Sequence, residues 1–246
     1  MIHLGKKWGR RYDNTIGIMK LFMRYYIPFK IKEGITFKNW FECGEFLKDQ
    51  RMYLVDGFVP EYHDVIYDIG SQYGDWSLLW AKKYGARVYA FEALPMNYIK
   101  LVKNMDANDF GDGTMFNDIH VYNIIVGDGK DTGMTIRGDM ASIDENMSGV
   151  QTVSMDSFIL SEGIVFPDIM KIDVEGFEYK VLIGSMRLLA TARPKVIIET
   201  HSTDLRNKCH DLLTNLGYEL KVEGKPRKGI GWMDQVVNLF YAPLGE

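Results

Sequence analysis

The stretch VIYDIGSQYGDWSLLWAKKYGARVYAFEA, from Val65 to Ala93, decides the fold that we predict for this chain. It passes from an apolar run through a glycine turn into a segment with apolar residues at helical spacing, and then into a second apolar run that ends at Glu92. A strand, a helix and a second strand in this order form the repeating unit of a parallel β-sheet. We therefore expect the glycines and Glu92 to meet at one edge of that sheet.

The same alternation continues toward the C-terminus. HVYNIIVGD, DIMKIDVEG and KVIIETH each predict a core strand, and GYELKVEG with QVVNLFYAP predict a closing pair. A helix is expected from Pro95, because proline is tolerated at the first helical position. These elements predict a doubly wound α/β domain over residues 61–246, with a mostly parallel sheet and helices on both faces.

Two segments depart from this rhythm. Residues from about 129 to 150 are rich in Gly, Met, Asp and Ser and predict an inserted loop or hairpin. Residues 1–60 predict an N-terminal helical cap or extension, with amphipathic contact to a membrane surface as the alternative. This segment is locally basic. Its basic side chains up to residue 32 are Lys6, Lys7, Arg10, Arg11, Lys20, Arg24, Lys30 and Lys32.

The composition is that of an ordinary globular protein, with 246 residues, 46% of them hydrophobic and 25% charged. The formal net charge of -4 argues neither for nor against an anionic partner. Cys43 and Cys209 stand alone, which gives no support to a disulfide framework or a zinc cluster and fits a reducing compartment. No apolar run approaches the roughly 20 residues that span a bilayer. We expect a cytoplasmic protein.

The glycine turn predicts a nucleoside ligand without phosphates. Gly70 and Gly74 allow close approach of the backbone to a ligand, and Glu92 can accept hydrogen bonds from two ribose hydroxyls. However, DIGSQYG lacks the G-x-G-x-x-G spacing of a pyrophosphate site, and Asp68 adds negative charge. S-adenosylmethionine, with a cationic amino acid end, fits better. The alternative is a simple turn beside a solvated strand end.

Carboxylates cluster where the predicted fourth strand reaches the same edge. Asp173 and Glu175 follow DIMKI, and crowding with partial burial can raise the pKa of such a group enough for it to act as a base. Lys171, two residues earlier on the same strand face, could keep an acid ionised. For Glu178 we favour a structural place at the start of the next helix.

Glu199 and His201 follow the predicted fifth strand, so both side chains can face the same crevice. His201 is a candidate proton acceptor because an imidazole titrates near neutral pH, although a histidine after a strand is more often structural. Asp173, Glu199 and His201 could also gather a divalent metal ion, but nothing in their spacing demands one. The sequence therefore predicts no metal site.

Five motifs together resemble the FkbM-type family of S-adenosylmethionine-dependent methyltransferases in order and spacing. They are DIGSQYG, VYAFEALPMNYIKLVKN, NIIVGD, MKIDVEGFEYKVLIGS and RPKVIIETH, and they span roughly residues 64 to 202. The resemblance implies the class I Rossmann-like fold, a seven-stranded sheet of order 3-2-1-4-5-7-6 with the last strand antiparallel. Two departures, GSQYG where the family more often has GANxG and Ala93 in place of a proline, could alter cofactor affinity.

The resemblance also implies roles for single residues. Glu92 would take the ribose hydroxyls, Gly127 and Asp128 would lie near the adenine, and Asp173 would lie by the methionine amino group or the incoming nucleophile. The catalytic candidates are Asp173, Glu175 and His201. The implied cofactor-binding residues are Asp68, Gly70, Gly74, Glu92, Gly127, Asp128 and Asp173.

The predicted function is O-methylation of a hydroxyl group on a sugar, a glycolipid or a secondary metabolite, with S-adenosylmethionine as cofactor. An alcohol loses its proton as it attacks, and Asp173 or Glu175 is the favoured base, with His201 as the rival. Two alternatives stay open: an RNA methyltransferase, suggested by the basic aromatic N-terminal segment, and a non-catalytic S-adenosylmethionine-binding protein. DVEG is not the N/D-P-P-Y/F motif of nitrogen-methylating enzymes, so a nucleic-acid partner is disfavoured.

Overall fold

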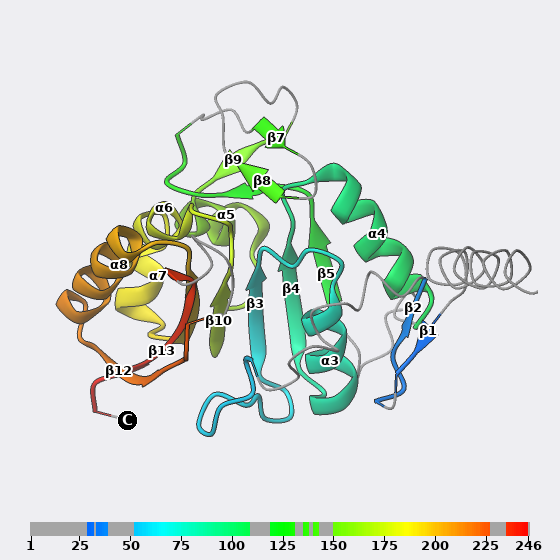
Figure 1. Ribbon diagram of the computed structural model, residues 1–246, viewed down its shortest axis with the longest axis horizontal. Helices are drawn as coiled ribbons and strands as arrows, with labels where there is room; N and C mark the ends of the chain where they lie inside the picture. The colour runs from blue at the N-terminus through cyan, green and yellow to red at the C-terminus, as the bar shows by residue number, and fades with distance from the viewer. Residues whose placement is uncertain are drawn as a thin grey trace, which may run out of the picture.

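The computed structural model describes residues 29–31, 33–38, 52–108, 119–130, 135–137, 140–142, 150–226 and 235–245. A central sheet of seven strands runs in the order β12-β13-β11-β10-β3-β4-β5 (Figure 1). Its strands are β3 (Val65–Ile69), β4 (Arg87–Phe91), β5 (Ile119–Tyr122), β10 (Ile169–Ile172), β11 (Lys195–Thr200), β12 (Tyr218–Glu223) and β13 (Val237–Pro243).

The direction of the strands matches the prediction. β3 pairs in parallel with both β4 and β10, and β5 and β11 extend the parallel part on either side. β13 is antiparallel to both β11 and β12. Read from β5, this is the order 3-2-1-4-5-7-6 with the last strand antiparallel, so the predicted doubly wound α/β sheet is confirmed.

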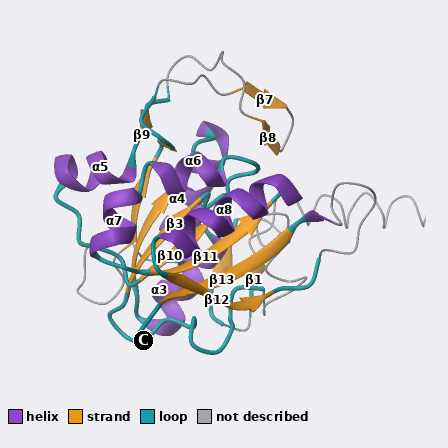
Figure 2. Cartoon of the chain, turned by 90° about the vertical axis from the view of Figure 1, so that its left-hand side faces the viewer, coloured by secondary structure: helices purple, strands orange, loops and turns teal. Residues whose placement is uncertain are grey.

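Helices cover both faces of the sheet (Figures 1 and 2). Trp80 of α3 and Leu101 of α4 belong to the apolar core on one face, and Phe158 of α5, Leu182 of α6, Leu189 of α7 and Leu213 of α8 belong to the core on the other. Their bounds are α3 (Asp75–Tyr84), α4 (Pro95–Asp106), α5 (Met155–Glu162), α6 (Glu178–Ile183), α7 (Met186–Thr191) and α8 (Thr203–Asn215).

β3 shows why the sequence forms a central strand. All five of its residues are buried, and successive side chains alternate between the two faces. Val65, Tyr67 and Ile69 pack into the core shared with α5 to α8, whereas Ile66 packs into the core shared with α3. Asp68 lies on the face of Ile66 and is fully buried, which requires a buried partner for its charge.

The turn from β3 into α3 depends on two glycines. Gly70 has φ 82° and Gly74, the residue before α3, has φ 80°, a region that favours glycine. A Cβ on Gly70 would lie 1.8 Å from the carbonyl oxygen of Asp173, and one on Gly74 would lie 2.1 Å from Cδ1 of Leu101. The glycine turn therefore brings the end of β3 close to the segment after β10.

The predicted third strand, HVYNIIVGD, was wrong as a single element. β5 ends at Tyr122, and β6 (Ile125–Val126) leaves the sheet to pair with β9 (Thr152–Val153). The reason lies at Asn123, whose side-chain amide donates to the carbonyl oxygens of Glu92 at 2.8 Å and Ala93 at 3.2 Å. These bonds fix the chain where β4 has already ended, so β5 has no further strand to pair with.

The insertion contains a hairpin of β7 (Thr135–Arg137) and β8 (Met140–Ser142), within the predicted range of about 129–150. Figure 1 places it on the side of the molecule where β3 and β4 end. In the N-terminal segment, β1 (Phe29–Lys30) and β2 (Thr36–Phe37) form a short antiparallel hairpin. Apart from residues 29–31, 33–38 and 52–60, the predicted helical cap lies outside the described residues.

The N-terminal hairpin is bound by one asparagine of α4 and by one in the turn after it. The side-chain oxygen of Asn108 accepts the backbone N–H of Thr36 at 2.8 Å, and that of Asn104 accepts the N–H of Lys38 at 2.9 Å.

Within the described part of the chain, no helix is long and apolar enough to cross a membrane. Of the predicted basic cluster only Lys30 falls among the described residues, and it is exposed. Cys209 is buried with a free thiol, and Cys43 lies outside the described residues.

Candidate active site

A pocket opens at the carboxyl ends of β3, β4, β10 and β11, with about 980 Å³ of space including its mouth. The connections from β3 and from β10 leave in opposite directions along the sheet, and ligands of doubly wound folds bind at such a point. The polar and charged lining residues are Tyr53, Ser71, Gln72, Asp75, Glu92, Asn97, Lys171, Asp173, Glu175 and Glu199.

Glu92 is held by donors at one end of this pocket. Its Oε1 accepts the backbone N–H of Leu94 at 2.8 Å and the amide of Asn97 at 3.4 Å, and its Oε2 accepts the N–H of Gln72 at 2.7 Å. Burial raises the pKa of the Glu92 carboxyl to about 7, although these donors and Lys171 act to lower it. Because each carboxylate oxygen has two lone pairs, Oε2 can accept one more donor from a ligand.

The glycine turn adds a hydroxyl and bare backbone to the same end. Ser71 is buried and lines the pocket, and its Oγ has no hydrogen-bond partner among the described residues. Gln72, whose N–H serves Glu92, adopts φ 50°, an uncommon conformation for a residue other than glycine. A buried polar atom without a partner is costly, so Ser71 marks a position where a ligand can supply the missing bond.

Lys171 brings a positive charge to the pocket lining. Its Nζ lies 3.0 Å from Oδ1 of Asp68 and 3.9 Å from Oδ2 of Asp173, and it donates to the carbonyl oxygen of Gly70 at 2.7 Å. Burial lowers the pKa of Lys171, but Asp68 and Asp173 outweigh that effect and raise it. The lysine therefore stays charged and pairs with the carboxylates of Asp68 and Asp173. The other oxygen of Asp68 accepts a hydrogen bond from Ser77.

Tyr53 closes the opposite end of the pocket. Its hydroxyl donates to Oδ2 of Asp173 at 2.9 Å and contacts Oε2 of Glu199 at 3.3 Å. The ring is buried, packs edge-on against Trp76 with centroids 4.9 Å apart, and lies 5.7 Å from the Lys171 ammonium. A residue from the N-terminal segment thus bridges the strand ends of β10 and β11.

His201 follows β11 and lies among four carboxylates. Its Nδ1 is 2.7 Å from Oε1 of the buried Glu178, and its Nε2 is 3.3 Å from Glu175. Burial acts to lower the pKa of His201, but the hydrogen bond to Glu178 and the nearby charges, with Asp173 foremost, raise it to about 9. With a pKa of about 9 the imidazole is protonated at neutral pH, which is unfavourable for a proton acceptor.

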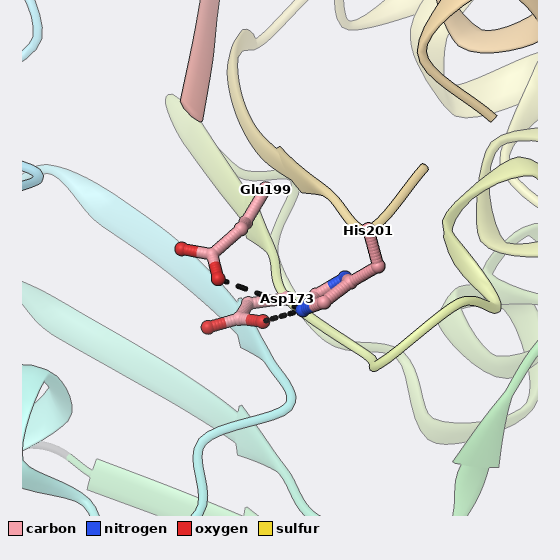
Figure 3. A group of neighbouring side chains, drawn as sticks. All are labelled: Asp173, Glu199 and His201. Atoms are coloured by element: carbon pink, nitrogen blue, oxygen red, sulfur yellow. Dashed lines mark ion pairs between the residues drawn. The ribbon is translucent and has the colours of Figure 1, made fainter. Parts of the chain in front are cut away.

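Three of these side chains converge from the ends of the neighbouring strands β10 and β11 (Figure 3). Nε2 of His201 lies 3.7 Å from Oδ1 of Asp173 and 3.5 Å from Oε1 of Glu199. One ligand atom from each residue falls within 4.8 Å of the others. The sequence placed these residues at neighbouring strand ends, and the structure brings them together.

The predicted site residues divide into two groups. Gly70, Glu92, Asp173 and Glu175 line the pocket, and His201 contacts the last two from behind. The other four predicted residues, described next, are outside its lining: Asp68, Gly74, Gly127 and Asp128.

Each of these four has a definite place. Asp68 lies beneath the pocket on Lys171, and Gly74 packs under α4. Gly127 approaches Gly184 so closely that a Cβ on the latter would lie 1.7 Å from the Gly127 carbonyl oxygen. Asp128 accepts the N–H of Lys130 at 3.2 Å. Their proposed cofactor contacts stay predictions.

Sequence reasoning missed two contributors. Tyr53 belongs to a segment without clear periodicity, and no local pattern connects it with strands that follow more than 100 residues later. Glu178 was assigned a structural place at a helix start, which it occupies as the first residue of α6. Its contact with His201 was not foreseen. The residue spacing in EGFE gave no signal for it, because that contact depends on how α6 packs beside β11.

Comparison with known proteins identifies the family. The Methyltransferase FkbM domain matches residues 68–220, well over half of the chain. The chain belongs to this family. The match begins after residues 52–60, so the segment that supplies Tyr53 lies outside it.

Relatives and solved structures agree with this assignment. Hexuronic acid methyltransferase AglP of Haloferax volcanii is 29% identical over 144 residues, which are 58% of each chain, so the match spans under two thirds of that relative. A methyltransferase FkbM from Methylobacillus flagellatus KT superposes with a TM-score of 0.56 at 15% identity, over 94% of this chain and 60% of that one. Aeropyrum pernix fibrillarin, in complex with natively bound S-adenosyl-L-methionine, gives 0.54 at 11% identity, over 89% and 84%. At these identities the two structures show the shared fold alone.

Proposed function

We propose that this protein uses S-adenosylmethionine to methylate a hydroxyl group on a sugar, a glycolipid or a secondary metabolite. The observation that carries the proposal is the pocket between Glu92 and the carboxylates at the ends of β10 and β11. A ribose acceptor stands at one end of it and candidate proton acceptors stand at the other. The membership of the chain in the FkbM methyltransferase family supports the same reaction class.

The residues present fit S-adenosylmethionine. Glu92 has a lone pair for a ribose hydroxyl, and the Ser71 hydroxyl, which has no partner in the described part of the chain, can bond to a ligand atom. The acidic far end of the pocket suits a ligand with a sulfonium and an ammonium group. In Aeropyrum pernix fibrillarin, which shares the fold, the bound ligand is S-adenosyl-L-methionine.

When bound, S-adenosylmethionine supplies an activated methyl group for in-line displacement. The chain contributes positioning, because the turn after β3 and the end of β4 hold the cofactor while β10 and β11 border the acceptor space. Met52, Trp76 and Phe177 line the pocket with apolar surface that excludes water. The remaining requirement is a group that takes the proton of the acceptor hydroxyl.

Asp173 and Glu175 are the candidates for that proton. Both line the pocket, whereas His201 stands behind them with Nδ1 bonded to Glu178. Glu175 adopts φ 52°, a conformation that is sparsely populated for residues other than glycine and that concentrates at functional sites. Asp173 accepts a hydrogen bond from the Tyr53 hydroxyl and lies 3.9 Å from the Lys171 ammonium.

The acceptor is assigned by chemistry. The first acceptor to test is a glycan that carries hydroxyl groups beside a carboxylate, because the AglP relative is named a hexuronic acid methyltransferase. The predicted cytoplasmic location and the predicted peripheral membrane contact stay predictions.

The test has a binding arm and an activity arm. Purified full-length protein is titrated calorimetrically with S-adenosylmethionine and with S-adenosylhomocysteine. It is then incubated with S-adenosylmethionine and a panel of glucuronic acid, galacturonic acid and neutral glycosides. Product is followed by mass spectrometry as a gain of one methyl group. Glu175→Gln is the informative variant and Glu162→Gln, an exposed position at the end of α5, is the matched control.

The outcomes are distinct. Micromolar binding of both ligands supports the cofactor assignment, and methylation that falls by roughly 100-fold or more in Glu175→Gln supports its role as base. Binding without methylation of any acceptor in the panel counts against the proposed acceptor class. A folded protein that binds neither ligand refutes the proposed function.

A further inference from the structure

We infer that Asp173, Glu199 and His201 form a binding site for a divalent metal ion at the inner end of the pocket. The inference starts from their convergence in Figure 3, where side chains from the end of β10, from β11 and from the turn after it meet. Binding of the ion does not depend on methyl transfer. Only the role given to the ion below rests on the proposed function.

The distances around Nε2 of His201 are those of ligands that share an ion. An imidazolium that donates to a carboxylate lies about 2.7–2.9 Å from its oxygen. Nε2 is instead 3.3 Å from Oε2 of the half-exposed Glu175, 3.5 Å from Oε1 of Glu199 and 3.7 Å from Oδ1 of Asp173, so none of the three carboxylates lies at that distance. Two ligands each about 2.0–2.1 Å from one tetrahedral zinc ion stand roughly 3.3–3.4 Å apart. Small shifts of these side chains would complete such a geometry.

A carboxylate outside the cluster holds the imidazole in the required direction. Oε1 of Glu178 lies 2.7 Å from Nδ1 of His201, and Glu178 itself is fully buried at the start of α6. Histidines that bind metals almost always donate their other ring N–H to a carboxylate, a carbonyl or water, which fixes the ring and the tautomer. Glu178 therefore presents Nε2, the metal-binding nitrogen, to Asp173 and Glu199.

Tyr53 fixes the two carboxylates in a similar way. Its hydroxyl is 2.9 Å from Oδ2 of Asp173 and 3.3 Å from Oε2 of Glu199. The oxygens on the His201 side are the other two, Oδ1 and Oε1. Each proposed ligand thus has a partner for the atom that would not bind the ion, which is the arrangement found around protein metal sites.

The donor set indicates the class of ion and its use. One imidazole and two carboxylates combine borderline and hard donors, which suits manganese or zinc better than ions that require thiolates. Three protein ligands leave coordination positions open. Because Asp173 and Glu199 line the pocket, an acceptor oxygen can occupy one of them. If the proposed function is correct, the ion would bind that oxygen and ease loss of its proton, and Glu175 rather than the ion-bound Asp173 would take that proton.

The test uses Mn²⁺ alone as the probe. Full-length protein treated with a chelator is titrated with Mn²⁺, and the unbound ion is measured by electron paramagnetic resonance. The titration is done at pH 8.0, because protons compete with the ion for His201 at lower pH. We expect one ion per chain and at least tenfold weaker binding in Glu199→Gln and in His201→Gln. Glu162→Gln, an exposed acid on α5, should bind as the wild type does. Circular dichroism confirms that each variant is folded.

A second measurement needs no variant. Electron spin echo envelope modulation of the Mn²⁺ complex of the wild-type protein should show coupling to an imidazole nitrogen. Failure of the wild type to bind Mn²⁺ at roughly millimolar concentration, absence of the nitrogen coupling, or equal binding in both ligand variants would each overturn the inference. Calorimetry with S-adenosylhomocysteine on the metal-free protein tests the proposed function separately, because Glu92 is not part of the cluster.

Discussion

The sharpest prediction concerns Glu92. Removing its charge should weaken ligand binding, because a ribose acceptor is lost, and should raise the relative stability of the protein at high pH, because a buried charge is removed. We consider Glu92→Gln, which keeps the size of the side chain and removes its charge. The carboxylate accepts three donors, including the backbone N–H groups of Leu94 and Gln72. A glutamine amide offers only one acceptor oxygen, so its NH₂ must face one of these donors.

The effect on binding follows from the lost acceptor. A hydrogen bond between a ribose hydroxyl and an ionised carboxylate contributes about 1.5–3 kcal/mol. Glu92→Gln should therefore weaken binding of S-adenosylhomocysteine by roughly 10- to 150-fold at pH 8. In the wild type, binding should weaken by about tenfold per pH unit below the pKa of about 7. The variant, lacking the titrating group, should show no such dependence.

The effect on stability has the opposite sign. The folded-state pKa of Glu92 is raised from 4.5 to about 7, so the folded protein binds the proton more tightly than the unfolded chain does. This contribution is fully present below pH 4.5, and it is lost as pH rises through about 7. The loss amounts to about 3 kcal/mol. The stability of Glu92→Gln relative to the wild type should therefore rise by up to that amount between pH 5 and pH 8.

Two assays decide the matter. Calorimetric titration with S-adenosylhomocysteine at several pH values gives the affinities, and urea denaturation at the same values gives the free energies of unfolding. Asp106→Asn, at the exposed end of α4, is the control for loss of a negative charge. Wild-type affinity in Glu92→Gln at pH 8 would refute the ribose contact. A stability difference that does not change with pH would refute the raised pKa.

Three further predictions concern other parts of the site and its support. Gly70 has φ 82°, and Gly70→Ala would place a Cβ 1.8 Å from the carbonyl oxygen of Asp173. We expect urea denaturation to show a loss of at least about 2 kcal/mol in the free energy of unfolding. An unchanged midpoint would contradict the close approach. Tyr53→Phe removes the hydroxyl that contacts both Asp173 and Glu199. Denaturation should show a loss of about 1–3 kcal/mol in the free energy of unfolding. An equally stable variant would mean that the two carboxylates do not need this hydroxyl. Asp156→Ala removes the acceptor for two backbone N–H groups in the first turn of α7. Thermal melting should show a loss of about 0.5–2 kcal/mol in the free energy of unfolding, with unchanged binding of S-adenosylhomocysteine. Altered affinity would show that α7 is coupled to the pocket.

Local sequence was sufficient for most of the sheet and for one end of the site. Buried strands such as VIYDI, the helix start at Pro95 and the glycine turn are set by side-chain alternation and by backbone conformations that short stretches determine. Since the carboxyl ends of parallel strands share one edge of the sheet, Glu92 and Asp173 could be placed at the same pocket before any coordinates were known.

Tertiary structure decided the rest. Tyr53 reaches Asp173 and Glu199 from a segment with no recognisable period, and Glu178 turns the ring of His201 only because α6 packs beside β11. The third strand breaks at Asn123 because β4 has already ended there, which is a property of the neighbouring strand. Periodicity reports which face of an element is buried, whereas contacts between distant side chains depend on how the elements pack. The sequence by itself therefore determined most of the sheet and the edge where ligands meet it, and only the packed chain determined where the third strand ends and which charges lie together at that edge.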